Sequence, residues 1–195
     1  PCIFEYVYFA RPDSIIDRIS VYKSRMRMGE RLAEKIRQES PDHDIDVGIP
    51  IPDTSRTSAL QMANHLGVKY REGFIKNRYS GRTFIMPDQA SRDAALRLKL
   101  NPIAEIFEGQ RVLLVDDSIV RGSTMQRIVR LVRSLNPAEL HLAVFAPPVK
   151  HPCFMGIDMS RHEELIAHQK DIEAIRRHIR ADSLAYLSHE GMLAA

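Results

Sequence analysis

The sequence predicts an α/β fold with a mostly parallel sheet flanked by helices. Short apolar runs bounded by turn residues recur along the chain, as is typical of buried strands. Segments rich in helix formers lie between these runs. This alternation implies parallel strands with helices on both faces of the sheet. A length of 195 residues fits one domain, and we expect residues 1–195 to form it.

Each element is expected from its own pattern. Strands are expected at the apolar or β-branched runs over residues 4–9, 45–51, 68–75, 112–115, 140–146 and 184–187. Helices are expected over residues 25–39, from just after residue 55 to about Leu66 with a stop at Gly67, from 123 to 135, and in short pieces between 160 and 195. Residues 76–102 are instead polar and basic without a strand pattern, although 88–100 could be helical. A loop of this length in a compact domain suggests a lid over a site.

Composition narrows the functional classes. The net charge is +3 with Lys and Arg spread along the chain, which disfavours nucleic-acid binding and suits a small anionic substrate. The two cysteines, Cys2 and Cys153, are too few for a disulfide framework, so a reducing, cytoplasmic compartment is expected. The sequence has no apolar run long enough for a membrane span, and PCIFEYVYF at its start is not expected to be a signal peptide, because it lacks a basic n-region and a long apolar h-region.

The most informative segment is RVLLVDDSIVRGST, residues 111–124. An apolar strand brings Asp116 and Asp117 to its carboxyl end, and Gly122, Ser123 and Thr124 then open a helix whose first N–H groups favour an anion. A ribose 5-phosphate needs both parts, because phosphate binds the N–H groups and the ribose hydroxyls bind carboxylates. A receiver-type acidic pocket or a plain acidic turn would not require the Gly-Ser-Thr part. No P-loop motif is present.

Residues 111–124 resemble the phosphoribosyl pyrophosphate (PRPP) binding signature of type I phosphoribosyltransferases. Segments 2–14 (CIFEYVYFARPDS), 76–85 (KNRYSGRTFI), 115–124 (VDDSIVRGST) and 151–158 (HPCFMGID) resemble one branch of that family, the glutamine PRPP amidotransferases. Ser123 departs from the Thr usual in that branch but keeps the hydroxyl. The resemblance implies the type I fold with a flexible lid loop and a small hood. It also implies transfer of phosphoribose from PRPP to ammonia in the first step of purine synthesis.

The resemblance also assigns residues to PRPP. It places a pyrophosphate loop at Pro52, Asp53, Thr54 and Ser55, and Thr54 or Ser55 is expected to cap a helix as well, since the two roles can coexist. Mg²⁺ is implied at Thr54, Asp116 and Asp117, since this ion prefers oxygen ligands. The remaining PRPP contacts are implied at residues of the signature loop, namely Ser118, Val120, Arg121, Gly122, Ser123 and Thr124.

Lys76, Arg78, Arg82 and Lys99 are the expected catalytic residues of the lid. Breaking the bond from C1 of PRPP to pyrophosphate places negative charge on the leaving group, which cations stabilise. Water must also be excluded from the cationic ribose. Any one of these cations could instead be an ordinary surface charge.

In the resembling family a glutaminase domain precedes this domain and supplies ammonia, and the present sequence is expected to lack it. Cys2 follows Pro1 and is not expected to act as a glutaminase nucleophile, so the chain alone should use free ammonia. Cys2 and Cys153 match two of the four cysteines that hold an iron–sulfur cluster in some members. A [4Fe-4S] cluster is therefore expected only in a longer parent chain, and two free thiols here.

Two other functions stay open on sequence grounds. The chain could be a PRPP-binding regulatory module without catalysis, or a phosphoribosyltransferase acting on a nucleobase. The resemblance further implies inhibition by purine nucleotides, whose 5-phosphate would bind the same cradle. A homo-oligomer is expected.

Overall fold

The computed structural model describes residues 2–76, 100–153 and 161–195. At its centre lies a five-stranded parallel sheet with the strand order β4-β3-β7-β8-β9. Its strands are β3 (Val47–Pro50), β4 (Lys69–Tyr70), β7 (Arg111–Asp116), β8 (Glu139–Val144) and β9 (Ser183–Tyr186). The predicted parallel sheet is thereby confirmed. β7 is buried along its four central residues, as expected for a strand covered on both faces.

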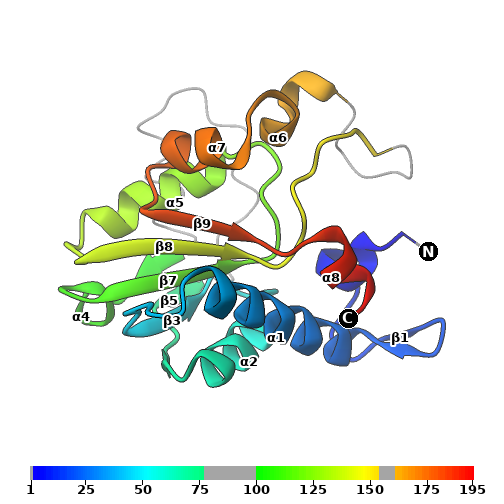
Figure 1. Ribbon diagram of the computed structural model, residues 1–195, viewed down its shortest axis with the longest axis horizontal. Helices are drawn as coiled ribbons and strands as arrows, with labels where there is room; N and C mark the ends of the chain where they lie inside the picture. Colours follow the sequence, from blue (N-terminus) through cyan, green and yellow to red (C-terminus); the bar gives the residue numbers. More distant parts are fainter. Residues whose placement is uncertain (1, 77–99, 154–160) are drawn as a thin grey trace.

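Helices cover both faces of this sheet (Figure 1). One face carries α1 (Val21–Glu39) and α2 (Arg56–Leu66), and the other carries α5 (Ser123–Arg133), α6 (Ile166–Gln169) and α7 (Ile172–Ile179). Each face has its own apolar cluster, because side chains alternate along the strands. Short elements complete the described chain: α4 (Ala104–Phe107), η2 (His162–Glu164) and α8 (His189–Leu193). In the described ranges no helix combines the length and the apolarity needed to cross a membrane.

Helix α1 begins four residues earlier than the helix formers alone predicted. Ser20 caps it, with its side chain accepting a hydrogen bond from the Lys23 backbone N–H at 3.3 Å. The buried stripe of α1 packs on α2 and on η1 (Glu5–Phe9). The approach to α2 is close, because a Cβ built on Gly29 would stand 2.3 Å from the Ser58 carbonyl oxygen.

The predicted strand at residues 4–9 is wrong. Glu5–Phe9 forms the one-turn π-helix η1. A helical turn lets Val7 become fully buried in the cluster beneath α1. The same turn leaves the Tyr6 carbonyl available to accept a hydrogen bond from Arg25. Tertiary packing here overrides the β preference of the aromatic residues. The strands of this region come later, as the hairpin β1 (Ile15–Ile16) and β2 (Ile19–Ser20).

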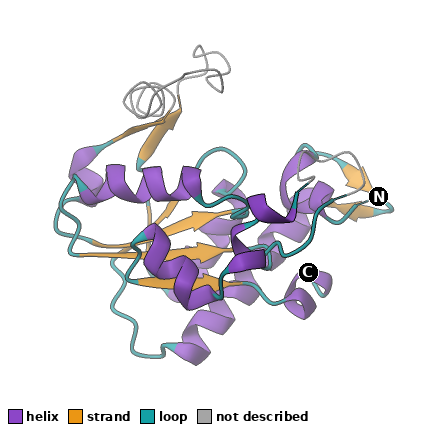
Figure 2. Ribbon diagram, turned by 90° about the horizontal axis from the view of Figure 1, so that it is seen from above, coloured by secondary structure: helices purple, strands orange, loops and turns teal. Residues whose placement is uncertain are grey.

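The predicted strand at 68–75 divides in two. β4 joins the central sheet, and β5 (Phe74–Lys76) pairs antiparallel with β6 (Leu100–Pro102). Figure 2 shows this two-stranded ribbon standing apart from the sheet. Residues 77–99, which carry most of the expected lid and of its possible helix, lie outside the described residues.

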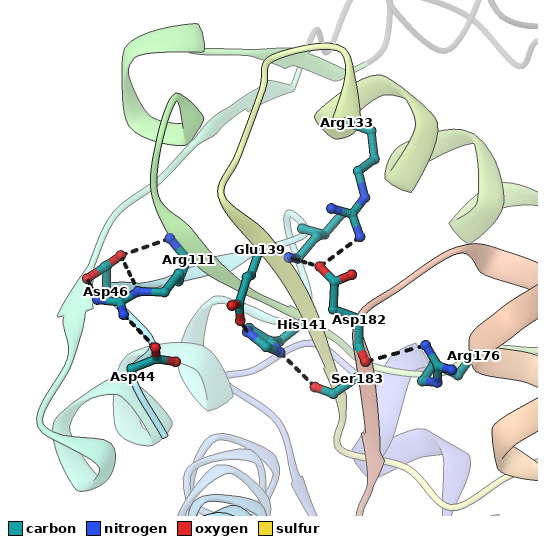
Figure 3. Close-up of polar contacts among 10 residues, drawn as sticks. Asp44, Asp46, Arg111, Arg133, Glu139, His141, Arg176, Asp182 and Ser183 are labelled. Carbon is teal, nitrogen blue, oxygen red and sulfur yellow. Dashed lines mark hydrogen bonds and ion pairs between the residues drawn. The ribbon is translucent and has the colours of Figure 1, made fainter. Parts of the chain in front are cut away.

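Ion pairs join the strands at the amino edge of the sheet (Figure 3). Arg111 at the start of β7 donates to Asp46 at 2.9 Å and to Asp44 at 2.5 Å, and its backbone N–H also donates to Asp46 at 2.8 Å. The hydrogen bonds from Arg111 lower the pKa of Asp46 to about 2. Two strands are thus held at their first residues by charge-assisted hydrogen bonds.

A second group of contacts holds β8 to β9. Asp182 accepts from the Leu140 backbone N–H at 2.6 Å and pairs with Arg133 at 2.8 Å. His141 lies within 2.9 Å of both Ser183 and Glu139. These contacts lie at the opposite edge of the sheet from the strand ends considered next, so they stabilise the frame on which those ends are placed.

We predict that Asp46→Asn causes a modest loss of thermal stability near neutral pH. The lowered pKa of Asp46 means that its carboxylate contributes stability above the unfolded value of 3.8, and that this contribution is lost as pH falls through about 2. The difference in melting temperature between wild type and variant should therefore disappear as the pH falls from 3.8 through about 2. Asp42→Asn, an exposed neighbour, is the control. A gap that persisted at the acidic end would contradict the assignment.

Candidate PRPP site at the carboxyl edge of the sheet

Two loops that are distant in sequence meet at the carboxyl edge of the sheet. Residues 52–55 follow β3, and Asp116 ends the adjacent strand β7. The buried Ser55 Oγ donates to Asp116 Oδ1 at 3.3 Å, across 61 positions of sequence. In open parallel sheets, ligands bind in such crevices at the carboxyl ends of the strands. The predicted pyrophosphate and ribose loops are therefore brought together.

The paired carboxylates lie side by side in a largely desolvated position. Asp116 Oδ1 accepts from the Asp117 backbone N–H at 2.9 Å, and Asp117 accepts from Ser118 Oγ at 2.6 Å. Burial, together with the charge of Asp117, raises the pKa of Asp116 well above its usual value. Burial raises the pKa of Asp117 to about 6, opposed by the Ser118 hydrogen bond and the charge of Arg25. Two adjacent buried carboxylates favour binding of a cation, which reverses these shifts.

The loop after Asp117 leads into the first turn of α5. Gly122 has a φ of +77° and occupies the N-cap position without a side-chain cap. Within the described chain, no acceptor meets the backbone N–H groups of Gly122, Ser123 and Thr124. Three N–H groups at a helix start can hold a phosphate. These N–H groups are therefore available for the predicted anion cradle.

Residues beyond 160 hold this cradle in place. The Ile166 backbone N–H donates to the Val120 carbonyl at 3.0 Å. Glu164 accepts from Arg121 at 2.8 and 2.5 Å and also pairs with Arg161. A Cβ on Gly122 would stand 2.6 Å from Ile166 Cδ1, so the Ile166 side chain would have to shift, and the φ of +77° would strain any side chain at this position. Glu164 was not among the predicted site residues, since no local pattern linked it to Arg121.

Two cationic side chains lie at the turn formed by residues 52–55. Lys76 Nζ lies 2.7 Å from Asp53 Oδ2, and Arg56 lies 3.3 Å from Asp53. Thr54 is partly exposed in the same turn, and the Pro52–Asp53 peptide is cis. Ser55 does occupy the N-cap position of α2, but its side chain makes no cap hydrogen bond, since it contacts Asp116 instead. Of the lid cations, Lys76 is placed at the turn, while Arg78, Arg82 and Lys99 lie outside the described residues.

Tyr186 is a further site neighbour that the sequence reasoning missed. Asp116, Val144 and Tyr186 occupy one row across β7, β8 and β9. Tyr186 is 2% exposed, and among the described residues its hydroxyl has no hydrogen-bond partner. Burial, followed by the charge of Asp116, raises the pKa of Tyr186. Only the alignment of Tyr186 with Asp116 across the sheet could have indicated this role. That alignment follows from the register of the strands, which the sequence alone does not give.

The described residues contain no group of three or more His, Cys, Asp or Glu side chains that could hold a metal by themselves. Two carboxylates at Asp116 and Asp117 nevertheless suit Mg²⁺, which commonly binds one or two carboxylates together with substrate phosphates. Cys2 and Cys153 are both partly buried, and neither forms a disulfide. The iron–sulfur expectation stays a prediction about a longer chain.

Comparisons with known proteins show the family to which the chain is related. The sequence pattern of the phosphoribosyl transferase domain family matches residues 18–171. Amidophosphoribosyltransferase of Pseudomonas aeruginosa is 59% identical over 186 residues, which cover 95% of this chain and 37% of that protein. Amidophosphoribosyltransferase of Methanocaldococcus jannaschii is 54% identical over 194 residues, covering 100% of this chain and 40% of that protein.

A solved structure shares the fold. Glutamine PRPP amidotransferase from B. subtilis, complexed with ADP and GMP, matches with a TM-score of 0.87 and 49% identity, over 99% of this chain and 41% of that one. The chain therefore spans about two fifths of the length of the relatives that it matches.

Proposed function

The chain belongs to the phosphoribosyl transferase domain family and has the type I phosphoribosyltransferase fold, and on that premise we propose that it transfers the phosphoribosyl group of PRPP to ammonia. The products are 5-phosphoribosylamine and pyrophosphate. The observation that carries the proposal is the contact between Ser55 and Asp116, which joins the pyrophosphate turn to the ribose carboxylates. The choice of ammonia is supported by identities of 48–59% to proteins named amidophosphoribosyltransferase.

Each part of PRPP has a matching part of the site. The 5-phosphate binds the N–H groups of Gly122, Ser123 and Thr124, which the described chain leaves without acceptors. The ribose 2- and 3-hydroxyls donate to Asp116 and Asp117. Carboxylates accept such hydrogen bonds strongly when water is excluded, and both side chains are largely desolvated.

The pyrophosphate group lies at the turn 52–55, where Lys76 and Arg56 supply positive charge. Both cations now pair with Asp53, so an incoming pyrophosphate competes with that carboxylate for them. Stabilising the charge that develops on the leaving group lowers the barrier to breaking its bond to C1. The attacking ammonia needs no side-chain nucleophile. Mg²⁺ held by Asp116 and Asp117, with Thr54 nearby, would add a further positive charge at the pyrophosphate.

Arg78, Arg82 and Lys99 complete the proposed catalytic set as parts of a lid that excludes water. They belong to residues 77–99, which begin and end at the β5–β6 ribbon. Because Lys76 in that ribbon already contacts Asp53, the segment starts beside the pyrophosphate turn. Support for the lid therefore comes from the position of Lys76, the residue that precedes the segment.

In the whole enzyme we propose that ammonia comes from glutamine through a separate glutaminase domain, as the first step of purine synthesis. Purine nucleotides are proposed as inhibitors, because a nucleotide 5-phosphate suits the same N–H cradle. The B. subtilis relative complexed with ADP and GMP supports this.

Pyrophosphate release tests the proposed reaction. The protein is incubated with PRPP and Mg²⁺, and then receives ammonium chloride at alkaline pH, hypoxanthine or buffer. We expect pyrophosphate release that depends on ammonia, and none above background with hypoxanthine or buffer. GMP should reduce that release in competition with PRPP.

Other results would select another function. Release that requires hypoxanthine would assign a nucleobase transferase. PRPP binding in calorimetry without release under any condition would assign a regulatory module. A protein that binds no PRPP would overturn the proposal as a whole.

A further inference from the structure

A segment from late in the chain, residues 161–169, packs onto the loop that leads into the phosphate cradle. Leu165, Ile166 and Ala167 in the middle of this segment are buried, whereas residues 161–163 are exposed. Glu164 stands between the two parts, with 23% of its side chain exposed. The apolar residues therefore anchor the segment and place one half-buried carboxylate beside the loop.

Three contacts of different kinds join this segment to three consecutive residues of the loop. The Ile166 backbone N–H donates to the Val120 carbonyl at 3.0 Å. Glu164 Oε2 accepts hydrogen bonds from Nε and from a terminal nitrogen of Arg121, at 2.8 and 2.5 Å, across 43 positions of sequence. Ile166 Cδ1 lies 2.6 Å from the place that a Cβ on Gly122 would take. The segment thus holds the loop up to the first residue of the cradle.

The Glu164 carboxylate is shared between two guanidinium groups. Oε2 accepts from Arg121, while Oε1 accepts from Arg161 in its own segment. The hydrogen bond from Arg121, followed by that from Arg161, lowers the pKa of Glu164. Hydrogen bonds between charged groups are stronger than neutral ones, and the planar guanidinium fixes their direction. The Arg121 side chain is therefore held in a defined orientation.

We propose that Glu164 is a positioning residue that holds the cradle at residues 122–124 in its phosphate-binding arrangement through Arg121. The inference rests on the proposed function, because the cradle is taken as the site of the 5-phosphate. Gly122 restrains the loop little by itself, since glycine adopts either sign of φ. Contacts that order the loop before the ligand arrives reduce the entropy lost on binding, and so increase affinity.

This role should separate the two ends of PRPP. The pyrophosphate turn is held by other contacts, Ser55 with Asp116 and Lys76 with Asp53. Loss of the Glu164 charge should therefore weaken ligands that carry a 5-phosphate and leave pyrophosphate binding intact. The 5-phosphate is remote from the reacting C1, so its contacts stabilise the ground state and the transition state alike. Weakening them should raise KM for PRPP while kcat is retained.

The test compares Glu164→Gln with Glu163→Gln, an exposed position in the same turn η2. Gln has the shape of Glu and keeps one acceptor oxygen, so the variant should fold, which its melting temperature checks. KM and kcat for PRPP are measured in the ammonia-dependent reaction. Inhibition constants are measured for ribose 5-phosphate and for pyrophosphate as competitors of PRPP. The same measurements on Arg121→Met, alone and combined with Glu164→Gln, complete a double-mutant cycle.

We expect Glu164→Gln to raise KM for PRPP and the inhibition constant of ribose 5-phosphate by roughly threefold to tenfold. This range lies between the effects of exposed ion pairs and of hydrogen bonds to charged groups. The value of kcat and the inhibition constant of pyrophosphate should stay within about twofold of wild type. Glu163→Gln should match wild type throughout. In the Arg121→Met background, Glu164→Gln should have no further effect.

Three results would overturn the inference and leave the proposed function in place, provided that pyrophosphate is still released from PRPP with ammonia. One is an unchanged inhibition constant of ribose 5-phosphate in Glu164→Gln. Another is an equal loss of pyrophosphate binding in that variant. The third is an undiminished effect of Glu164→Gln after Arg121 has been replaced. Failure of the wild-type protein to bind PRPP would overturn both proposals.

Discussion

Replacing Asp116 with Asn is expected to weaken PRPP use strongly and at the same time to stabilise the ligand-free protein. A lost hydrogen bond to a charged group is worth about 1.5–3 kcal/mol, so kcat/KM for PRPP should fall roughly 10- to 150-fold. The stability gain arises because Asn removes one of two adjacent buried carboxylates. A gain of roughly 1 kcal/mol corresponds to an increase in melting temperature of about 2–4 °C in a protein of this size.

The pH dependence gives the sign of this effect. Burial raises the folded-state pKa values of Asp116 and Asp117, so the protonated carboxyls contribute to the stability of the folded state. This contribution to stability is lost as the pH rises. For Asp117 the loss falls between the usual value of 3.8 and about 6. The gap in melting temperature between Asp116→Asn and wild type should accordingly widen with increasing pH across this range.

Asp117→Asn is the matched comparison. It also removes one of the paired carboxylates, but with it goes a negative charge that opposes the desolvation of the buried Arg25, so the gain in stability should be smaller. Adding PRPP and Mg²⁺ should raise the melting temperature of wild type more than that of either variant. Asp116→Asn with unchanged kinetics and unchanged stability would contradict the placement of Asp116 in the site.

Gly29→Ala is expected to destabilise the protein by about 1–3 kcal/mol, the usual cost of overpacking. A Cβ at this position would stand 2.3 Å from the Ser58 carbonyl oxygen and 3.0 Å from the Ser58 Cα. Both atoms are backbone, so α1 and α2 must move apart. The melting temperature should fall by roughly 2–4 °C for each kcal/mol lost.

The direction of the change in melting temperature distinguishes overpacking from the ordinary effect of a Gly→Ala substitution in a helix. In an unobstructed helix Gly→Ala stabilises by up to about 1 kcal/mol, because Ala has the higher helix propensity. Gly191→Ala in α8 is the control, since the nearest obstacle there is the Leu187 side chain, which can turn away. An unchanged or increased melting temperature for Gly29→Ala would mean that α1 and α2 do not cross at this residue.

The central strands and the PRPP loop could be predicted because their signals are local. Residues 112–115 are apolar over the full length of a strand, and Asp116, Asp117 and Gly122 follow within one continuous segment. A buried parallel strand demands such a run wherever it lies in the sheet. Helix α2 was likewise visible from the turn before it and from Gly67 at its end, which has a φ of +71°.

Prediction failed where neighbouring elements decided the outcome. The aromatic residues of segment 4–9 are compatible with a strand by themselves, but Val7 packs beneath α1 and the backbone around it hydrogen-bonds with Arg25. Arg25 itself carried a signal, since it interrupts the apolar stripe that contains Val21 and Met28. The carbonyl groups that accept its hydrogen bonds belong to Tyr6 in η1 and to Ala10 just after it, and the sequence alone did not place that segment beside α1.

The sequence alone therefore determined the α/β class, the order of the central strands along the chain and the chemistry of the phosphate and ribose loops. These properties depend on the periodicity of side chains and on the dihedral preferences of a few adjacent residues. Only the tertiary structure decided that Ser55 reaches Asp116, that Lys76 lies at Asp53, and that Arg25 donates hydrogen bonds to the backbone of Tyr6 and Ala10. Those contacts require the order of the strands in the sheet and the placement of α1 over it, which arise from burial of the whole chain rather than from any one segment.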